Sequence, residues 1–421
     1  MSTLHNQQHN SGNEIVQVQV TPAEELRARA ARLQEMMQGA GFEGMMVTHN
    51  ADVFYLSGAV QQAQLYLPLE GRPVLMVRKH PGRAASSSAL DDGSVVAVRS
   101  LRELPALIVG AGPAPKRIGF LFDTLPVLTY QAYQKALAPL NAELGDASML
   151  VRRARAIKSE FEVEQIRRAA DVADAGVQAA AEHLREGATE VEVAARVEAA
   201  LRVAGHSGTL RIRFYGQEMH MGHLLAGVSG AVPSFMNSPT GGYGQGPWAP
   251  YGAGARTIKR GEPVFLDYCG EWGGYIADQT RMLSIGRLSS FWLDAYAAMR
   301  EVQDHLAREV RPGTASGQVF DMAVERATQL GYGDNFMGPP EEESPGQRMP
   351  FVGHGVGLEL DEWPPLQRGT DAPLDAGMVL AIEPKLLFTG RGAIGIEDTY
   401  LLTEGGMVPL THSSRDIVEV G

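Results

Sequence analysis

Residues 264–286 read VFLDYCGEWGGYIADQTRMLSIG, and this stretch decides the fold. An apolar run from Val264 to Leu266 ends in Asp267, and a second acid, Asp278, follows eleven residues later. The glycine pair at 273–274 predicts a tight turn between the two acids, because glycine accepts the backbone angles that such turns need. The sequence therefore predicts a β-hairpin that brings two carboxylates together.

Three further polar residues stand in apolar segments later in the chain. They are His354 in GHGVG, Glu383 in VLAIEP and Glu397 in AIGIED. Each acid taken singly is also consistent with a strand end that faces water. Several carboxylates that converge inside a sheet need a compensating positive charge, because an unpaired buried carboxylate is costly. The four carboxylates and one imidazole are therefore expected to hold two divalent metal ions.

Composition and charge exclude several classes of protein. The chain has 421 residues, of which 44% are hydrophobic and 20% charged, as is typical of a globular protein of two or three domains. A net charge of -12 argues against nucleic acid or an anionic membrane as partner. Cys269 is the only cysteine, which excludes an intrachain disulfide and a cysteine-based zinc site. Together with the polar amino-terminal segment, this predicts a cytoplasmic protein with no membrane span.

The first part of the chain is expected to consist of a flexible tail, residues 1–20, and a mixed α/β domain, residues 21–153. Apolar residues at helical spacing predict a helix from Pro22 to Met37. Short β-like runs follow it. Those at 64–69 and 73–78 are separated by a connection of hairpin length, which predicts a β-hairpin.

Residues 154–421 are expected to form a second domain of the α+β class. Ser159 and Glu162 form a capping-box pattern at the head of a long helix, and a second helix is predicted from Glu190 to Ala204. Helices followed by antiparallel strands occur twice in this part of the chain. The order predicts an internal pseudo-repeat.

Four segments of this second domain resemble the metal-binding motifs of the pita-bread metallopeptidase family, which contains methionine aminopeptidase, aminopeptidase P, prolidase and creatinase. They are LDYCGEWGGYIADQTRMLSIG, GHGVGLELDEWP, LAIEPKLLF and GIEDTYLLTEGG. Two earlier segments extend the similarity over most of the chain, YLPLEGRPVLMVRK and IKSEFEVEQIRRAADVADAG. The resemblance is to the branch of the family that contains creatinase, aminopeptidase P and prolidase. The resemblance implies a C-terminal pita-bread fold preceded by a smaller creatinase-type N-terminal domain.

The resemblance also implies roles for the five polar residues. Asp267 would chelate one metal ion, Asp278 and Glu397 would bridge both ions, and His354 and Glu383 would hold the second. Glu383 would in addition be catalytic, as a proton shuttle. These ligand types suit Mn²⁺, Co²⁺, Fe²⁺ and Zn²⁺, and they do not discriminate between these ions. Two such ions activate water and polarise a carbonyl, which is the chemistry of amide hydrolysis.

The residues that would contact substrate depart from the family pattern. One expected histidine falls near position 250, where the chain reads WAPY, and the other falls at position 361, which is Asp361. Asp361 is a catalytic candidate, as a base or as a binder of a cationic substrate group, or else it pairs with an arginine or lysine of the protein. Further substrate-binding candidates are His220, His223, Tyr243, Trp248, Tyr251 and Trp363. Packing is the alternative for the two histidines, and a plain surface loop for the segment around Tyr243.

The leading hypothesis is a cytoplasmic hydrolase that resembles Xaa-Pro aminopeptidase and prolidase and acts on a small peptide or peptide-like molecule. A non-peptidase hydrolase resembling creatinase is a variant of it. The second hypothesis is a metal-dependent lyase resembling dimethylsulfoniopropionate lyase, which has a string similar to Asp361-Glu362-Trp363-Pro364 and uses the aspartate as base. The third is a non-catalytic binding protein. In the creatinase branch the N-terminal domain packs over a partner's active site, so the resemblance implies a homodimer.

Overall fold

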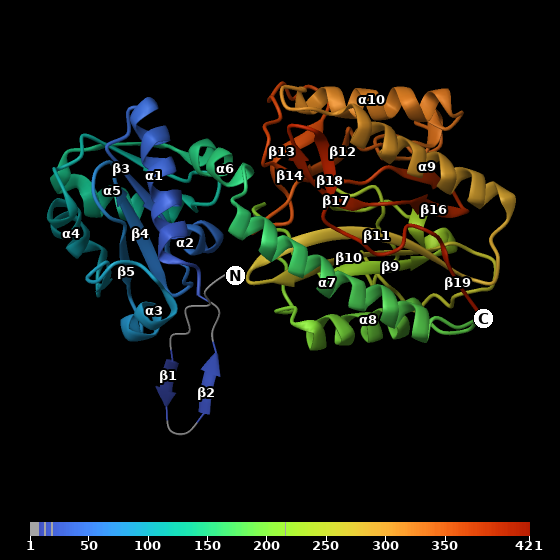
Figure 1. Ribbon diagram of the computed structural model, residues 1–421, viewed down its shortest axis with the longest axis horizontal. Coiled ribbons are helices and arrows are strands. Elements are labelled where there is room, and N and C mark those ends of the chain that lie inside the picture. Colours follow the sequence, from blue (N-terminus) through green and yellow to red (C-terminus); the bar gives the residue numbers. More distant parts are fainter. Residues whose placement is uncertain (1–7, 12–13, 18–19, 215) are drawn as a thin grey trace. The chain divides into compact units, whose positions relative to one another are not determined.

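The computed structural model describes residues 8–11, 14–17, 20–214 and 216–421. The chain forms two compact units, Met1–Arg155 and Ala156–Gly421 (Figure 1). Much of the expected tail lies outside the described residues. The described part of it contains two short antiparallel strands, β1 (Gln8–Ser11) and β2 (Glu14–Gln17).

The first unit is built around a six-stranded sheet in the order β6-β5-β4-β3-β7-β8. The pairs β3–β4 and β4–β5 are antiparallel, and the other neighbours are parallel. The antiparallel pair β4–β5 is the hairpin that the sequence predicts. The strands are β3 (Gly44–Val47), β4 (Ala63–Pro68), β5 (Val74–Val77), β6 (Val95–Ala97), β7 (Arg117–Phe120) and β8 (Glu143–Asp146).

Helices complete the first unit, and the first of them covers the segment in which the sequence predicts a helix. Leu26, Leu33 and Met37 of this helix are buried, so one face packs on the core of the unit. The helices are α1 (Ala23–Gly39), α2 (Asn50–Ser57), α3 (Pro81–Ser87), α4 (Leu104–Ala111), α5 (Val127–Leu137) and α6 (Ser148–Ala156).

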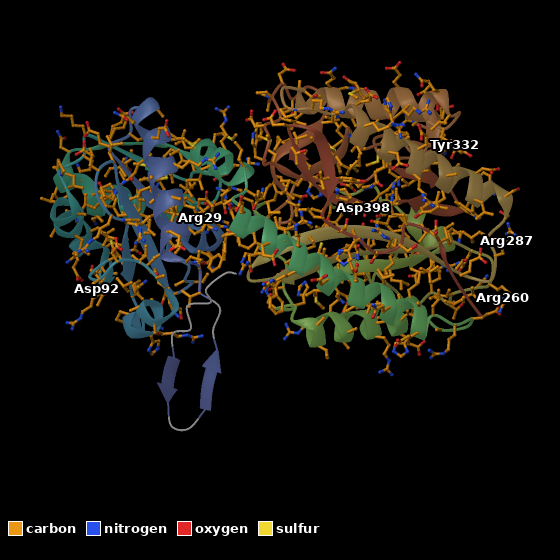
Figure 2. The ribbon with its side chains drawn as sticks, viewed as in Figure 1. Arg29, Asp92, Arg260, Arg287, Tyr332 and Asp398 are labelled. Atoms are coloured by element: carbon orange, nitrogen blue, oxygen red, sulfur yellow. The ribbon has the colours of Figure 1, made fainter. Side chains whose placement is uncertain are left out.

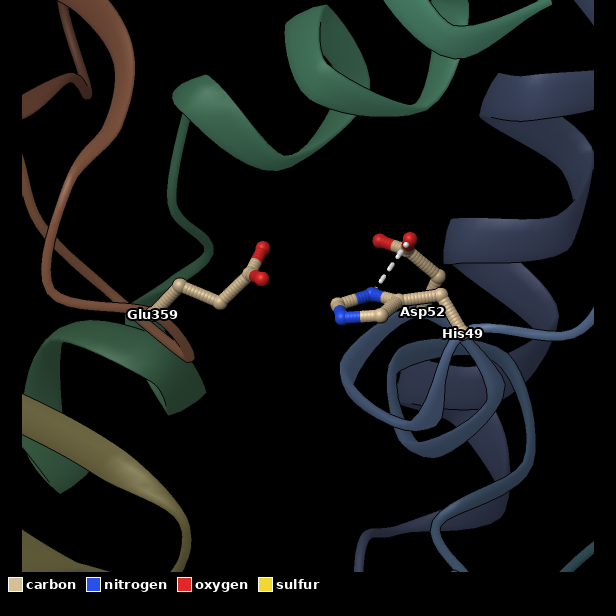
Figure 3. A group of neighbouring side chains, drawn as sticks. All are labelled: His49, Asp52 and Glu359. Atoms are coloured by element: carbon tan, nitrogen blue, oxygen red, sulfur yellow. Dashed lines mark hydrogen bonds and ion pairs between the residues drawn. The ribbon is translucent and has the colours of Figure 1, made fainter. Parts of the chain in front are cut away.

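A polar cluster lies at the start of α2. Figure 3 shows His49 beside Asp52, with His49 Nδ1 3.0 Å from Asp52 Oδ2. Arg155 Nη1 donates to the other oxygen, Asp52 Oδ1, over 2.6 Å, and both residues are buried. The pairing compensates charges that would otherwise destabilise the interior of this unit. Glu359, also labelled in Figure 3, belongs to the second unit, where Arg213 Nη1 donates to its Oε2.

The second unit repeats one arrangement twice, as the order of predicted helices and strands indicates. In Figure 1, α7 (Glu160–His183) and α8 (Glu190–Ala204) lie on one side of this unit. The other pair, α9 (Ser290–Glu309) and α10 (Ser316–Gln329), lies on the opposite side, and the sheets lie between the pairs. Residues from both sheets can therefore meet in the middle of the unit.

The larger sheets of this unit have the orders β19-β11-β10-β9 and β13-β12-β14-β17-β18, and β15 pairs with β16. The first sheet consists of β9 (Gly222–Ala226), β10 (Val264–Trp272), β11 (Tyr275–Ile285) and β19 (Val418–Val420). The second consists of β12 (Phe351–Gly355), β13 (Glu362–Gln367), β14 (Val379–Ile382), β17 (Asp398–Thr403) and β18 (Gly406–Pro409). The two-stranded sheet consists of β15 (Lys385–Phe388) and β16 (Gly392–Gly395).

The start of α7 has the capping box that the sequence predicts. Ser159 Oγ accepts a hydrogen bond from the Glu162 amide over 3.2 Å, and Glu162 Oε2 accepts one from the Ser159 amide over 3.0 Å. These bonds satisfy backbone donors that a helix leaves free at its start. The helix then packs its buried residues, among them Ile166 and Ala173, against the first sheet.

In the part of the chain that the structure describes, none of the helices combines the length and the apolar character that crossing a lipid bilayer requires.

Candidate metal centre

The two carboxylates of the predicted hairpin lie on neighbouring strands of one sheet. β10 and β11 pair antiparallel, with Asp267 opposite Thr280 and Cys269 opposite Asp278. Because side chains alternate between the faces of a strand, this register places all four side chains on one face. Cys269 Sγ donates to Asp278 Oδ1 over 3.3 Å, so the thiol contacts a predicted ligand.

The other three predicted ligands come from the second half of the unit. His354 lies on β12 opposite Ala381 of β14, and Glu383 follows β14 directly. Glu397 lies between β16 and β17 and forms an isolated bridge with Thr280 of β11. One ligand atom each from Asp278, His354 and Glu397 lie within 4.8 Å of one another. All five predicted ligands line one cavity.

His354 has the orientation of a metal ligand. Its Nδ1 lies 3.0 Å from the carbonyl oxygen of Gly355, so Nδ1 donates, and Nε2 is the nitrogen whose lone pair a metal ion would take in the neutral imidazole. Nε2 lies 3.9 Å from Asp278 Oδ2 and 3.7 Å from Glu383 Oε1. Among the described residues, the buried atom Glu397 Oε1 has no hydrogen-bond partner. Acceptor atoms that face one another in this way fit a divalent cation.

The charges of the site also favour a cation. Burial, followed by the charge of Asp267, raises the pKa of Asp278 to about 7. Burial and the charge of Asp278 hold the pKa of Glu397 well above its usual value. Burial lowers the pKa of His354, but the surrounding carboxylates, Asp361 first, outweigh burial and raise it. Asp278 and Glu397 therefore give up their protons less readily than free carboxyl groups do, and a metal ion would compete with those protons.

Lys385 lies within the same group, and the sequence-based prediction omitted it. Its Nζ donates to Glu383 Oε2 over 2.6 Å, to Asp267 Oδ2 over 3.1 Å and to Glu397 Oε2 over 3.3 Å. Burial lowers the pKa of this ammonium, but the charges of the three carboxylates raise it well above its usual value. The available signal was a lysine in the apolar run LAIEPKLLF, because a charge buried in a sheet needs a partner.

His223 is a second neighbour of Asp267. β9 pairs with β10 so that His223 stands opposite Asp267, and its Nε2 lies 3.7 Å from Asp267 Oδ2. The same nitrogen lies 3.0 Å from Thr240 Oγ1. Burial raises the pKa of Asp267, but the Lys385 ammonium and then His223 outweigh burial and hold this pKa below its usual value. His223 lines the cavity, and its contact with substrate stays a prediction.

The remaining substrate-binding candidates lie in different surroundings. Tyr251 is buried and lines the cavity, and His220 stacks on the Tyr251 ring with 4.9 Å between ring centroids. Tyr243 and Trp248 are 55% and 80% exposed, and neither is among the cavity-lining residues. Trp363 is half-buried and packs against the core beneath α9 and α10. Contact of these side chains with substrate stays a prediction.

Asp361, the second catalytic candidate, lies at the cavity. Its Oδ1 is 3.5 Å from His354 Nε2, and its side chain is 30% exposed. Among the residues that the structure describes, no arginine or lysine forms an ion pair with Asp361. The alternative in which Asp361 pairs with a cation of the protein therefore has no support in this unit.

A buried arginine fixes the segment that carries Glu397. Arg281 Nη1 donates to the carbonyl oxygen of Glu397 over 2.7 Å, and Nη2 donates to Asp398 Oδ1 over 2.6 Å. Arg281 is wholly buried, and Figure 2 labels its partner Asp398 inside the second unit. The guanidinium therefore holds the backbone on which the ligand stands.

Comparisons with known proteins agree with this geometry. Metallopeptidase family M24 matches residues 164–404, and the creatinase/prolidase N-terminal domain matches residues 29–157. The chain is 25% identical over 397 residues to an Xaa-Pro dipeptidase of Pyrococcus horikoshii, and the match covers 93% of this chain and 99% of that protein.

Solved structures of similar proteins confirm the predicted pita-bread fold and the creatinase-type domain before it. An Xaa-Pro dipeptidase from Bacillus anthracis superposes with a TM-score of 0.78 at 23% identity, over 94% of this chain and 100% of that one. The dipeptidase PepE from Mycobacterium ulcerans superposes with a TM-score of 0.75 at 25% identity, over 95% and 99% of the two chains. Since the M24 match covers more than half of the sequence, this chain belongs to metallopeptidase family M24 and is a metal-dependent hydrolase.

Proposed function

We propose that this chain hydrolyses an Xaa-Pro peptide or a small peptide-like amide, with divalent metal bound among Asp278, His354, Glu383 and Glu397. The observation that carries the proposal is the set of acceptor atoms: His354 Nε2 faces three carboxylates, those of Asp278, Asp361 and Glu383, and the buried Glu397 Oε1 has no partner among the described residues. The bound metal would polarise the substrate carbonyl and activate the attacking water.

Glu383 is the residue that we assign to proton transfer. Its Oε2 accepts a hydrogen bond from Lys385, whereas its Oε1 faces His354. Lys385 therefore fixes the carboxylate beside the acceptor atoms, and this carboxylate is the group that would accept the proton of the attacking water. The same carboxylate could then deliver the proton to the leaving amine.

His223 and Tyr251 are the predicted substrate-binding residues that best fit a role at the cavity. His223 stands opposite Asp267 and lines the cavity, and the chain lacks the histidine that the family pattern places near residue 250. We propose that this imidazole, supplied by β9, contacts the substrate in place of the missing one. The Tyr251 hydroxyl accepts a hydrogen bond from the His220 backbone amide, which holds the Tyr251 ring in place.

The identity and the number of the metal ions are also part of the proposal. Mn²⁺, Co²⁺, Fe²⁺ and Zn²⁺ all accept this mixture of carboxylate and imidazole ligands. The resemblance implies two ions, with Asp267 as a ligand of the first. The contacts of Lys385 with Asp267, Glu383 and Glu397 favour one ion.

The decisive test of the function is a substrate screen with protein that has been loaded with Mn²⁺. Ala-Pro and Phe-Pro, dipeptides without proline, and small carboxylate-bearing amides are incubated with the enzyme, and the released amines are quantified. We expect hydrolysis that a chelator abolishes and Mn²⁺ restores. A sulfonium carboxylate is included in the same screen, and release of an unsaturated carboxylate from it, without amide hydrolysis, would instead establish the lyase alternative.

Hydrolysis is favoured over the alternatives by the relatives described above, which are peptidases by name. The lyase hypothesis depends on Asp361 acting as a base, and a location at the cavity does not separate that role from substrate binding. A non-catalytic binding protein would have no need of acceptor atoms arranged for a cation. Creatinase-like hydrolysis of a non-peptide amide is covered by the same screen.

Asp361→Asn is expected to lower turnover by about 10²-fold or more and to leave the metal content unchanged, whichever catalytic role the residue has. An ionised aspartate accepts a proton or binds a cationic group, and asparagine of the same size does neither. Steady-state kinetics on the substrate found in the screen, with metal analysis of the same sample, checks this. Undiminished turnover would rule out both roles.

We further propose that residues 21–153 form a creatinase-like domain, that residues 154–421 form the catalytic domain, and that the protein acts in the cytoplasm as a homodimer. The support is the match of both regions to domains of the creatinase and prolidase type. Light scattering at micromolar concentration is expected to give twice the chain mass of 45.3 kDa. An active species with the mass of a single chain would contradict the dimer.

A further inference from the structure

The position of Lys385 conflicts with a centre of two metal ions. The side chain is 2% exposed, and its ammonium contacts three of the five predicted ligands, Asp267, Glu383 and Glu397. A lysine ammonium has three N–H donors, and here each has a carboxylate acceptor. The ammonium is therefore fully coordinated by oxygen atoms that a second metal ion would need.

The strand around Lys385 holds the side chain in this place. Lys385 stands opposite Gly395 on β16, and a Cβ atom at position 395 would lie only 2.7 Å from Lys385 Cγ. Glycine at this position therefore leaves room for the lysine stem. On another side, Nζ lies 5.4 Å from the centre of the Phe265 ring, close enough for a cation–π contact.

The ammonium occupies one side of the centre. It contacts Asp267 Oδ2 and Glu397 Oε2, which belong to the ligands that the resemblance assigns to the first ion. Its contact with Glu383, a ligand of the second ion, uses Oε2, which is not the oxygen that faces His354. The remaining acceptors are Asp278 Oδ2, His354 Nε2, Glu383 Oε1 and Glu397 Oε1, whereas the hydrogen bonds of Lys385 to described residues go to Asp267 Oδ2, Glu383 Oε2 and Glu397 Oε2. The free acceptors are therefore those of the second ion.

We infer that the Lys385 ammonium takes the place of one divalent cation, so that the centre binds a single metal ion on the His354 side. Asp267 then serves as an anchor for Lys385 and is not a metal ligand. One divalent ion and one ammonium leave less positive charge beside four carboxylates than two divalent ions would. Such a centre suits a substrate that brings a cationic group of its own, for instance a free amino terminus.

This inference rests on the proposed metal-dependent function, and metal stoichiometry tests it independently of turnover. Purified protein is dialysed against excess Mn²⁺ and then against metal-free buffer, and manganese is measured by mass spectrometry against protein from amino-acid analysis. We expect one manganese per chain for the wild type and for Lys385→Arg, which keeps the charge. Lys385→Ala removes the ammonium and opens its place, so two manganese ions per chain are expected.

Anomalous diffraction at the manganese edge gives the second measurement. In wild-type crystals we expect one peak beside His354 and none beside Asp267, and in Lys385→Ala crystals a peak at both places. Two manganese ions in the wild type would overturn the inference and leave the proposed hydrolase intact. One ion in both wild type and Lys385→Ala would also overturn it, because the lysine would then not be the cause. Should Lys385→Ala fail to fold, the wild-type stoichiometry and peak positions still decide.

Discussion

Replacing Asp278 with alanine is expected to remove the bound metal and to abolish hydrolysis together. Asp278 has a ligand atom within 4.8 Å of ligand atoms of His354 and Glu397. Burial and the nearby charge of Asp267 raise its pKa to about 7, so a cation bound beside this carboxylate would stabilise its charged form. Loss of several kcal/mol of transition-state stabilisation corresponds to a decrease in kcat/KM of at least about 10³-fold. Metal analysis and kinetics on one sample measure both effects.

The folded state itself should tolerate the Asp278→Ala change, because the substitution removes a buried carboxyl group whose charged form is disfavoured there. Circular dichroism and thermal unfolding in metal-free buffer check this. Glu404→Ala is the matched control, since Glu404 is an exposed acid of the same unit. Full activity of a thoroughly metal-free wild-type sample would contradict the metal requirement altogether.

Arg281→Met is expected to lower the free energy of unfolding by about 3–5 kcal/mol, because it leaves Asp398 buried without its closest cationic partner. Arg281 Nη2 lies 2.6 Å from Asp398 Oδ1, whereas Arg415 Nε lies 3.6 Å from the other oxygen of that carboxylate. Methionine fills much of the space of the arginine stem but supplies no donors. Chemical denaturation of the metal-free protein measures the change.

The matched control for Arg281 is Arg287→Met, at an exposed position labelled in Figure 2. A surface substitution of this kind typically changes stability by less than about 0.5 kcal/mol. A double variant with Asp398→Asn should recover part of the loss, because the unpaired charge is then absent. Equal stability of the Arg281 and Arg287 variants would show that the buried pair is not a determinant of stability.

The hairpin with Asp267 and Asp278 was predictable because its information is local. One short segment contains the apolar runs, the glycine turn and the two acids. The turn then determines which residues of the two strands stand opposite each other. The helix from Glu190 to Ala204 was predictable for the same reason, since its periodicity and its final glycine are adjacent in sequence. Motif resemblance then supplied the pita-bread fold, which the comparisons confirm.

Lys385 and His223 escaped prediction as neighbours of Asp267 because their positions depend on the pairing of distant strands. His223 reaches Asp267 through the register of β9 with β10, across a long intervening loop. Lys385 reaches it from a strand that lies 118 residues further along the chain, although the partner of that strand, β16, is a near neighbour in sequence. A shift of one residue in the pairing of β9 with β10 would turn His223 to the opposite face, and the sequence alone contains no local mark of that register.

The contact between Cys269 and Asp278 makes the Cys269 thiol a natural probe of how often the metal centre opens to solvent. Cys269 is the only sulfhydryl group in the sequence and is 2% exposed on β10, beside the residues of the metal centre. Cys269 also lines the cavity, so a colourless alkylating reagent labels it when the cavity opens or the central strands separate, and the labelling rate follows the opening of this unit. Since metal would bind the closed state alone, the slowing of labelling by added Mn²⁺ provides an affinity without any substrate.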